Sequence, residues 1–121
     1  MSTFINHTNH PSKMWSPGQT AEAKQYGDIV DMPFPEIDPE ADTEAVKAMA
    51  QKSLEMIRRI DPQAVLCQGE SVYSFALVTL LKECGIKTIA ACSRREVKES
   101  AGEEGTIHKT AVFRFVRFRE Y

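Results

Sequence analysis

The chain has 121 residues, of which 42% are hydrophobic and 26% are charged, as in ordinary globular proteins and unlike disordered or collagen-like chains. The net charge of −2 argues against a protein that coats nucleic acid by charge alone. No apolar run approaches the ~20 residues of a membrane span, and the first residues lack the basic and apolar regions of a signal peptide. We therefore expect a single cytoplasmic domain, residues 1–121, with reduced cysteines and with neither a membrane nor duplex nucleic acid as a partner.

The first third of the chain reads as a strand, a helix and a second strand. Residues 3–7 are a short β-prone run, which predicts a strand. Ser16-Pro17-Gly18-Gln19 is a capping box, which predicts a helix that runs to about Tyr26 and stops at Gly27. A second strand is expected over residues 28–32.

The same alternation continues as far as residue 92. Apolar residues at helical spacing, short apolar runs and the positions of Gly and Pro define these elements. The expected elements are a helix over residues 42–60, a strand over 64–67, a helix over 72–83 and a strand over 87–92.

The end of the chain departs from this alternation. Residues 96–100 and 106–118 flank a turn-prone segment and predict a terminal antiparallel hairpin. In its second strand Phe113 and Phe115 share one face, whereas Val116 and Phe118 share the other. This change of phase indicates a β-bulge or a strand that is buried on both sides.

Four strands separated by three helices predict a parallel sheet with right-handed crossovers. The expected fold is therefore α/β and Rossmann-like, with four parallel strands, three helices and the terminal hairpin. In such sheets ligands bind outside the carboxyl ends of the strands. That edge collects the loop after the first strand (Thr8, Asn9, His10, Ser12 and Lys13), the loop after the third (Gln68, Gly69, Glu70 and Ser71) and the residues after the fourth (Ser93, Arg94 and Arg95).

Several of these residues also have plain structural interpretations. Asn9 and Ser12 are suited to hydrogen-bond the loop backbone, His7 is suited to point into the sheet, and Trp15 is suited to brace the following helix. The histidines and isolated cysteines lack a zinc-binding spacing, so we expect no metal. Cys92 is expected to be a small buried residue rather than a nucleophile.

The anion-binding signals are local ones. No GxGxxG or GxxxxGK[ST] pattern occurs, so neither a dinucleotide fingerprint nor a P-loop is supported, and we expect no cofactor. Glu70 either compensates the dipole of the following helix or contacts a ribose or an adenine. Arg94 and Arg95 either bind phosphate or pair with neighbouring acidic residues.

The three loops together resemble the small CRISPR-associated proteins related to CARF domains, among them the ring nucleases. The residues that carry the resemblance are Asn6-His7-Thr8-Asn9-His10-Pro11-Ser12, Gln68-Gly69-Glu70 and Cys92-Ser93-Arg94-Arg95. The resemblance implies a CARF-like fold and a protein that binds cyclic oligoadenylate, such as cyclic tetra-adenylate. It also implies metal-independent cleavage, in which a ribose 2′-hydroxyl attacks the adjacent phosphorus and leaves a 2′,3′-cyclic phosphate.

That chemistry asks the protein mainly for positioning and for positive charge near the phosphate. Arg94 and Lys13, with Ser93, are the residues expected to hold the phosphate, and His10 is the expected general acid or base. Ring nucleases usually place a Ser or Thr after the first strand, which Thr8 or Ser12 matches here. Two histidines in the first loop depart from that pattern and leave the catalytic assignment open.

A domain of this size is too small to surround a cyclic tetranucleotide, so we expect a homodimer whose two-fold axis passes near the ligand loops. The apolar flank of the helix over residues 72–83 offers an interface, although contact with the terminal hairpin would bury it equally well. Two other functions remain open. The first is a non-catalytic protein that binds and sequesters cyclic oligoadenylate. The second is a nucleoside deoxyribosyltransferase-like enzyme with Glu70 as its nucleophile.

Overall fold

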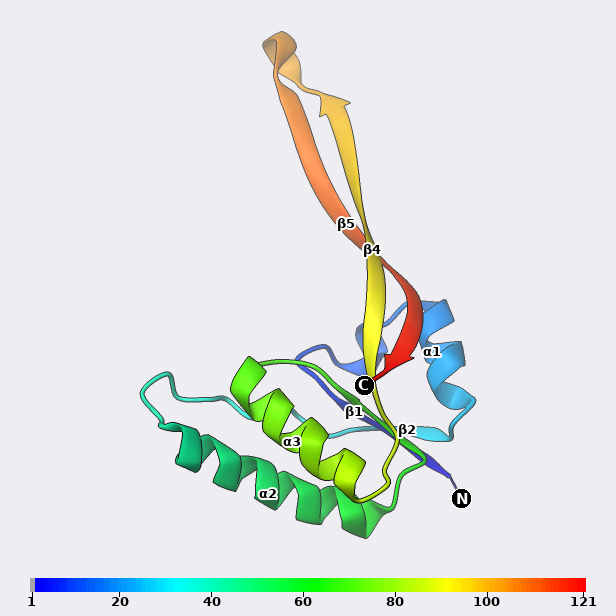
Figure 1. Cartoon of the computed structure of the whole chain (residues 1–121). Coiled ribbons are helices and arrows are strands. Elements are labelled where there is room, and N and C mark those ends of the chain that lie inside the picture. The colour runs from blue at the N-terminus through cyan, green and yellow to red at the C-terminus, as the bar shows by residue number, and fades with distance from the viewer. Residues whose placement is uncertain (1) are drawn as a thin grey trace.

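The computed structural model describes residues 2–121 and has an α/β architecture (Figure 1). The strands are β1 (Thr3–His7), β2 (Asp28–Asp31), β3 (Ala64–Cys67), β4 (Thr88–Ala101) and β5 (Ile107–Glu120). The helices are α1 (Pro17–Lys24), α2 (Thr43–Ile60) and α3 (Ser71–Glu83), with short 3-10 turns at Ser12–Met14 and Glu103–Gly105.

One mixed sheet carries all five strands in the order β2-β1-β3-β4-β5. The first four strands are parallel to their neighbours, and β5 runs antiparallel to β4. Strand order reverses between β1 and β3, because β2 lies on one side of β1 and β3 lies on the other. The carboxyl ends of β1 and β3 therefore meet at the point where α/β sheets usually bind ligands.

Helices cover both faces of the sheet, so the body has three layers. Residues Ile5, Val65 and Cys67 face α2 and α3, and pack against the apolar side chains of these helices. Their neighbours in sequence, Phe4 and Leu66, lie on the other face with Ile89 and the ring of Phe118, and form a cluster with Ala23 of α1. All four residues of β3 are buried, as expected of a short apolar strand that is covered on both faces.

The capping signals of the sequence form the helix ends. The Ser16 hydroxyl accepts the backbone amide hydrogen of Gln19 at the start of α1. At the start of α2, an Asp42 carboxylate oxygen accepts the backbone amide hydrogen of Ala45 at 2.8 Å. Gly85 follows α3 with a φ of +73°, a conformation that favours glycine. These local rules explain why most of the observed boundaries lie within two residues of the expected ones.

The end of the sheet differs from the expectation. The expected fourth strand and the first strand of the expected hairpin are one continuous strand, β4, so the sheet has five strands rather than four plus a separate hairpin. The long β4 and β5 leave the body together and project from it as an arm (Figure 1). We define the arm as residues 93–101 and 107–115.

A bulge marks the root of the arm, as the change of phase in the sequence indicated. Cys92 pairs with Arg117, whereas the next residue, Ser93, pairs with Phe115, so Val116 is the extra residue. This insertion brings Phe115 and Phe118 to the same face, where their rings meet at 4.9 Å between centroids. Aromatic side chains therefore continue from the core onto the arm.

Candidate functional site

A cleft of about 550 Å³ opens at the carboxyl ends of β1, β3 and β4, on the side of the sheet that carries α1. Its walls come from the loop after β1, the start of α1, the end of β3 and the root of the arm. The residues that line the cleft are Thr8, Asn9, His10, Met14, Trp15, Ser16, Gln19, Leu66, Gln68, Gly69, Ala91, Ser93, Phe113 and Phe115.

The chemical character of this lining is aromatic and polar but almost uncharged. Trp15, Phe113 and Phe115 supply rings, and the amide and hydroxyl side chains supply hydrogen-bonding groups. Among the described residues that line the cleft, none is Lys, Arg, Asp or Glu, and His10 is the one residue with a titratable imidazole. Such a surface suits a planar, polar ligand better than a bare anion.

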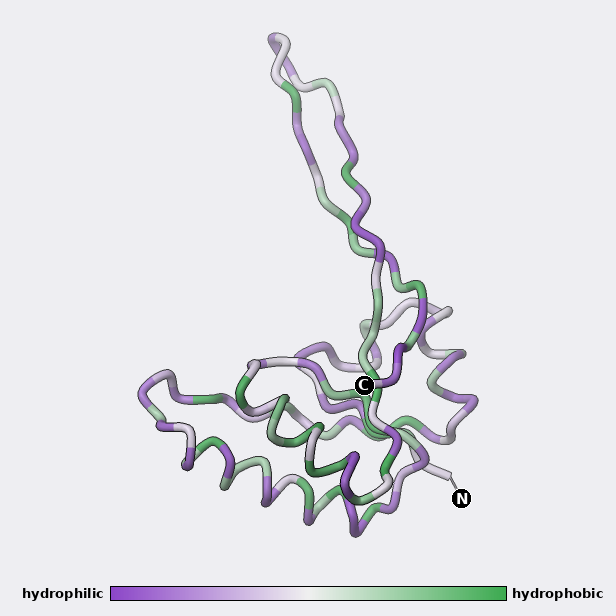
Figure 2. Tube along the Cα trace, in the orientation of Figure 1, coloured by the Kyte–Doolittle hydropathy of each residue, from purple (hydrophilic) through white to green (hydrophobic). Residues whose placement is uncertain are grey.

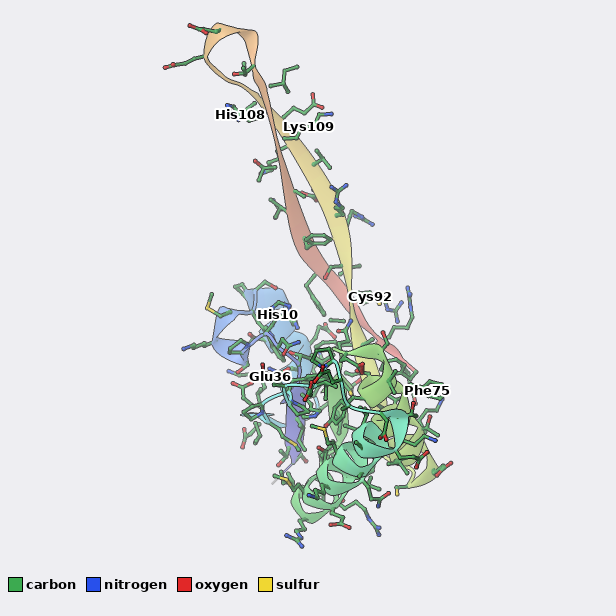
Figure 3. All side chains as sticks on the ribbon, turned by 90° about the vertical axis from the view of Figure 1, so that its left-hand side faces the viewer. His10, Glu36, Phe75, Cys92, His108 and Lys109 are labelled. Carbon is green, nitrogen blue, oxygen red and sulfur yellow. The ribbon has the colours of Figure 1, made fainter. Side chains whose placement is uncertain are left out.

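The loop after β1 is held in place by hydrogen bonds that converge on the carbonyl oxygen of His10. The Asn6 side-chain amide donates to this oxygen at 2.9 Å and the Trp15 indole at 3.2 Å, while the Thr8 hydroxyl oxygen accepts the His10 amide hydrogen at 3.1 Å. Asp31 at the end of β2 accepts from the Asn6 amide at 2.8 Å. His10 is exposed (Figure 3), yet its backbone position is fixed by hydrogen bonds with three side chains.

The other expected residues of this loop lie outside the cleft lining. Ser12 donates its hydroxyl hydrogen to the Asp31 carboxylate at 2.9 Å, so it braces the loop against the end of β2 rather than through the loop backbone as expected. Lys13 lies in an exposed 3-10 turn and does not line the cleft. Trp15 packs edge-to-face on Phe4 and also lines the cleft, so its position is more than a brace for α1.

Gln68 joins β3 to β4 through its side chain. The amide oxygen accepts from the Ala91 backbone at 2.8 Å, and the amide nitrogen donates to the Ala91 carbonyl at 3.3 Å. This side chain therefore extends the strand pairing at the floor of the cleft. Gly69 is required beside it, because a Cβ atom at this position would lie 2.3 Å from the Phe34 ring.

Glu70 is the N-cap of α3 and does not line the cleft. Its carboxylate oxygen accepts the amide hydrogen of Tyr73 at 2.7 Å, which is the dipole-compensating interpretation of this residue. Ser71 is the first residue of α3 and lies outside the lining as well. One carboxylate oxygen of Glu70 is therefore held at the helix terminus.

The two arginines at the root of the arm point to opposite sides of β4, because successive side chains of a strand alternate. Ser93 lines the cleft, so Arg95 lies on the same face, where it is paired across the ladder with Phe113. Arg94 lies on the other face, paired with Arg114. Neither arginine lines the cleft itself, but Arg95 lies on its side of the arm.

Beneath the cleft a buried polar chain links the layers. The His7 Nδ1–H donates to the Met32 carbonyl at 2.8 Å, and Nε2 accepts from the Tyr73 hydroxyl at 2.7 Å. The Tyr73 oxygen lies 2.7 Å from the Ser53 hydroxyl. Burial lowers the pKa of His7, which is fully buried, so this histidine is neutral and structural.

The cysteines offer no reactive centre at the cleft. Burial raises the pKa of the Cys67 thiol to about 12, which keeps it protonated. Cys92 is half-buried rather than buried, and it lies on the face of β4 opposite Ser93. Among residues 2–121 no three His, Cys, Asp or Glu side chains come together as a possible metal site.

The expected dimer surface on α3 is only partly covered. Phe75 is 77% exposed and Val72 is 45% exposed, so neither α2 nor the arm buries this flank. The contact of α3 with the chain end is a hydrogen bond from the Lys82 ammonium to the Tyr121 main-chain oxygen at 2.7 Å. Of the helices described for residues 2–121, none has the length and apolar character needed to cross a membrane.

The sequence did not single out the aromatic wall of the cleft. Phe113 and Phe115 come from the last strand, and Gln19 comes from α1, so no loop motif includes them. The usable signal was the change of phase along β5, which indicated a bulge but not which face it would enlarge.

Fold and site together define an α/β protein of three layers with an uncharged aromatic cleft at the carboxyl edge of its sheet. The family model described as "Uncharacterized protein MJ1673 family" matches residues 2–119, and the chain belongs to this family. No curated protein matches the chain.

Proposed function

We propose that this chain has a CARF-like fold and binds a cyclic oligoadenylate in the cleft at the carboxyl ends of β1, β3 and β4. The observation that carries the proposal is the pairing of three aromatic rings with uncharged hydrogen-bonding side chains in one cleft at the strand-order reversal. Adenine bases stack on aromatic rings, and stacking contributes about 1–3 kcal/mol per base. Amide side chains such as those of Asn9 and Gln19 match the donor and acceptor atoms of the adenine edge.

The phosphates need a positive charge that the cleft lining does not supply. Arg95 suits this role better than Arg94, because it lies on the cleft side of the arm, two residues after Ser93 and opposite Phe113. Its planar guanidinium group suits the paired oxygens of a phosphodiester. The two arginines are consequently a matched pair for mutagenesis.

A homodimer completes the proposed site. A cyclic tetranucleotide has two-fold symmetry and exceeds what one cleft encloses, so two clefts related by a two-fold axis would share one ring. In this arrangement each protomer binds half of the adenines. The stoichiometry is therefore one ring for two chains.

Cleavage of the bound ring is a second candidate function, and the position of His10 in the cleft favours it. A ribose 2′-oxygen attacks the adjacent phosphorus, the bond to the 5′-oxygen breaks, and the products carry a 2′,3′-cyclic phosphate and a 5′-hydroxyl. His10 either takes the proton of the 2′-hydroxyl or gives a proton to the 5′-oxygen. The fixed backbone of His10 supports either role, since proton transfer needs a positioned group.

Binding is testable through Trp15, because it is the single tryptophan of the chain and lines the cleft. Cyclic tetra-adenylate is expected to quench its fluorescence, whereas linear tetra-adenylate and AMP quench it only at much higher concentration. Phe113→Ala removes one stacking contact from each of the two protomers that share the ring, and should weaken binding by a factor of at least about 5 to 100. Met56→Ala, a control at an exposed apolar residue of α2 outside the cleft, should bind normally.

The arginine pair tests the phosphate contact in the same assay. Arg95→Ala should lose about ten- to a hundredfold in affinity, as expected for a charge-assisted bond to phosphate, and Arg94→Ala should lose little. No quenching by any cyclic oligoadenylate up to millimolar concentration would refute the proposed ligand. Equal losses in both arginine variants would refute the proposed orientation of the ring.

Cleavage is tested by single-turnover incubation in EDTA with product analysis. His10→Ala is expected to bind the ring normally and to cleave it about 10²- to 10⁴-fold more slowly, whereas His108→Ala on the distant arm keeps the full rate. If the wild-type protein returns the ring intact, it does not cleave cyclic oligoadenylate and only binds and sequesters it. Full cleavage by His10→Ala would remove His10 from the mechanism.

A further inference from the structure

One face of the arm carries most of the exposed apolar side chains of the arm, together with three charged ones. Side chains alternate along both strands, so every second residue faces the same side as the cleft wall. This arm face carries three exposed apolar side chains: Phe113 at the edge of the cleft with 67% exposure, and Ile107 at 67% and Val97 at 48% beyond it. The residues that share the arm face are Ser93, Arg95, Val97, Glu99, Ala101, Ile107, Lys109, Ala111, Phe113 and Phe115.

The opposite face of the arm is polar. It carries Arg94, Glu96, Lys98, Ser100, His108, Thr110, Val112 and Arg114, of which Glu96 and Arg114 form an ion pair. Figure 2 shows hydrophobic and hydrophilic residues interspersed along both strands of the arm. The arm is therefore an amphipathic ribbon, with most of its exposed apolar side chains on one face.

A two-stranded ribbon alone in water is at best marginally stable, and it needs further strands or packing against an apolar surface. The outer arm receives neither from its own body, as the exposure of Phe113 and Ile107 shows. Clustered exposed apolar side chains, unlike single ones, mark contacts with other molecules. The remaining question is which molecule covers the arm face.

The charges on the arm face match a second copy of the same face. In each protomer Glu99 lies 3.6 Å from Lys109 across the ladder, with Arg95 four residues before Glu99. Two ribbons stacked by a two-fold axis along the strands place Glu99 against Lys109 of the second copy. A two-fold axis across the strands at Val97 places Glu99 against Arg95 of the second copy. Both arrangements bring opposite charges together around an apolar centre, and neither sets like charges against each other.

We propose that two copies of this chain associate through their arm faces, with Val97 and Ala111 at the middle of the contact and Ile107 toward its tip. Nine residues of a strand span about 30 Å and two strands are about 10 Å wide, so the stacked faces cover about 300 Å² per copy. That is less than the roughly 800 Å² per partner of a standard interface, so the arms alone give a weak, reversible dimer. The association requires no ligand, and it is therefore separable from the proposed binding of cyclic oligoadenylate.

Sedimentation velocity of the ligand-free full chain, over a dilution series up to about 100 µM, tests this contact. The wild-type chain is expected to show a reversible monomer–dimer equilibrium. Val97→Glu and Glu99→Lys should each raise the dissociation constant about tenfold or more. Val97→Glu would bury a charge in the contact. Glu99→Lys would make every charged residue of the arm face basic, so the two copies would repel each other. Circular dichroism of each variant checks that the sheet is intact.

The matched control is Thr110→Glu, which adds the same side chain as Val97→Glu but on the polar face of the arm. It should dimerise as the wild-type chain does. A wild-type chain that stays monomeric over the whole series would overturn the proposal and leave the arm face to a different partner. Equal weakening by Thr110→Glu and Val97→Glu would overturn it as well, because the effect would then not depend on the apolar face.

Discussion

Lowering the pH from 6.5 to 5.5 should cost the folded protein up to about 1 kcal/mol through His7 alone. In the unfolded chain this imidazole takes up a proton as the pH falls through its ordinary value of about 6.5. In the folded protein burial lowers the pKa of His7, and the hydrogen bond to the Met32 carbonyl offsets only part of that effect. Unfolding therefore takes up a proton below pH 6.5, and the free energy of unfolding falls with pH until the folded-state pKa is reached.

Urea unfolding at the two pH values measures this effect. Between pH 6.5 and 5.5 the wild-type chain should lose more stability than His7→Gln, which has no titrating group at this position. The comparison uses the change between the two pH values for each variant, so a lower starting stability of His7→Gln does not affect it. His10→Gln removes an exposed histidine instead of the buried one and is the control for the loss of an imidazole. If His7→Gln and the wild-type chain lose the same stability between pH 6.5 and 5.5, the buried neutral histidine is not the cause.

Three further substitutions test the packing around the site, each by the midpoint of urea unfolding. Tyr73→Phe should destabilise the fold by about 1–3 kcal/mol, because Nε2 of His7 loses its buried donor, and an unchanged midpoint would contradict this chain of hydrogen bonds. Gly69→Ala should cost about 1–3 kcal/mol, since its Cβ would overlap the Phe34 ring, and a neutral result would mean that the ring moves freely. Asp42→Ala should cost about 0.5–2 kcal/mol through the lost N-cap of α2, whereas Asp42→Asn should keep most of it.

The body of the fold was predictable because its determinants are local. A capping serine before Pro17, an aspartate before α2 and a glycine after α3 are read directly from neighbouring residues. The buried run of β3 has one physical solution in a small domain, a strand covered on both faces. The parallel order then follows from the alternation of strands and helices.

The arm was not predictable in the same way, because its length depends on pairing rather than on composition. Residues 93–95 are polar, and the sequence was interpreted as a loop between two strands at this point. The cross-strand partners in β5 make β4 continuous instead, since each of these residues has an opposite residue in the ladder. Only the bulge was signalled in advance, by the spacing of the phenylalanines.

The candidate site shows that the type of a residue does not determine the direction in which its side chain points. Arg94 and Arg95 have the same chemistry and adjacent positions, yet strand alternation puts one on each face of the arm. Gln68 and Glu70 both look like ligand-binding side chains, but the first completes the pairing of β3 with β4 and the second caps α3. The direction of a side chain is set by register and caps, and it is this direction that separates the residues of the cleft from those beside it. A loop motif therefore locates the edge of the sheet at which ligands bind, while the aromatic wall comes from a strand more than forty residues later in the chain than Gln68.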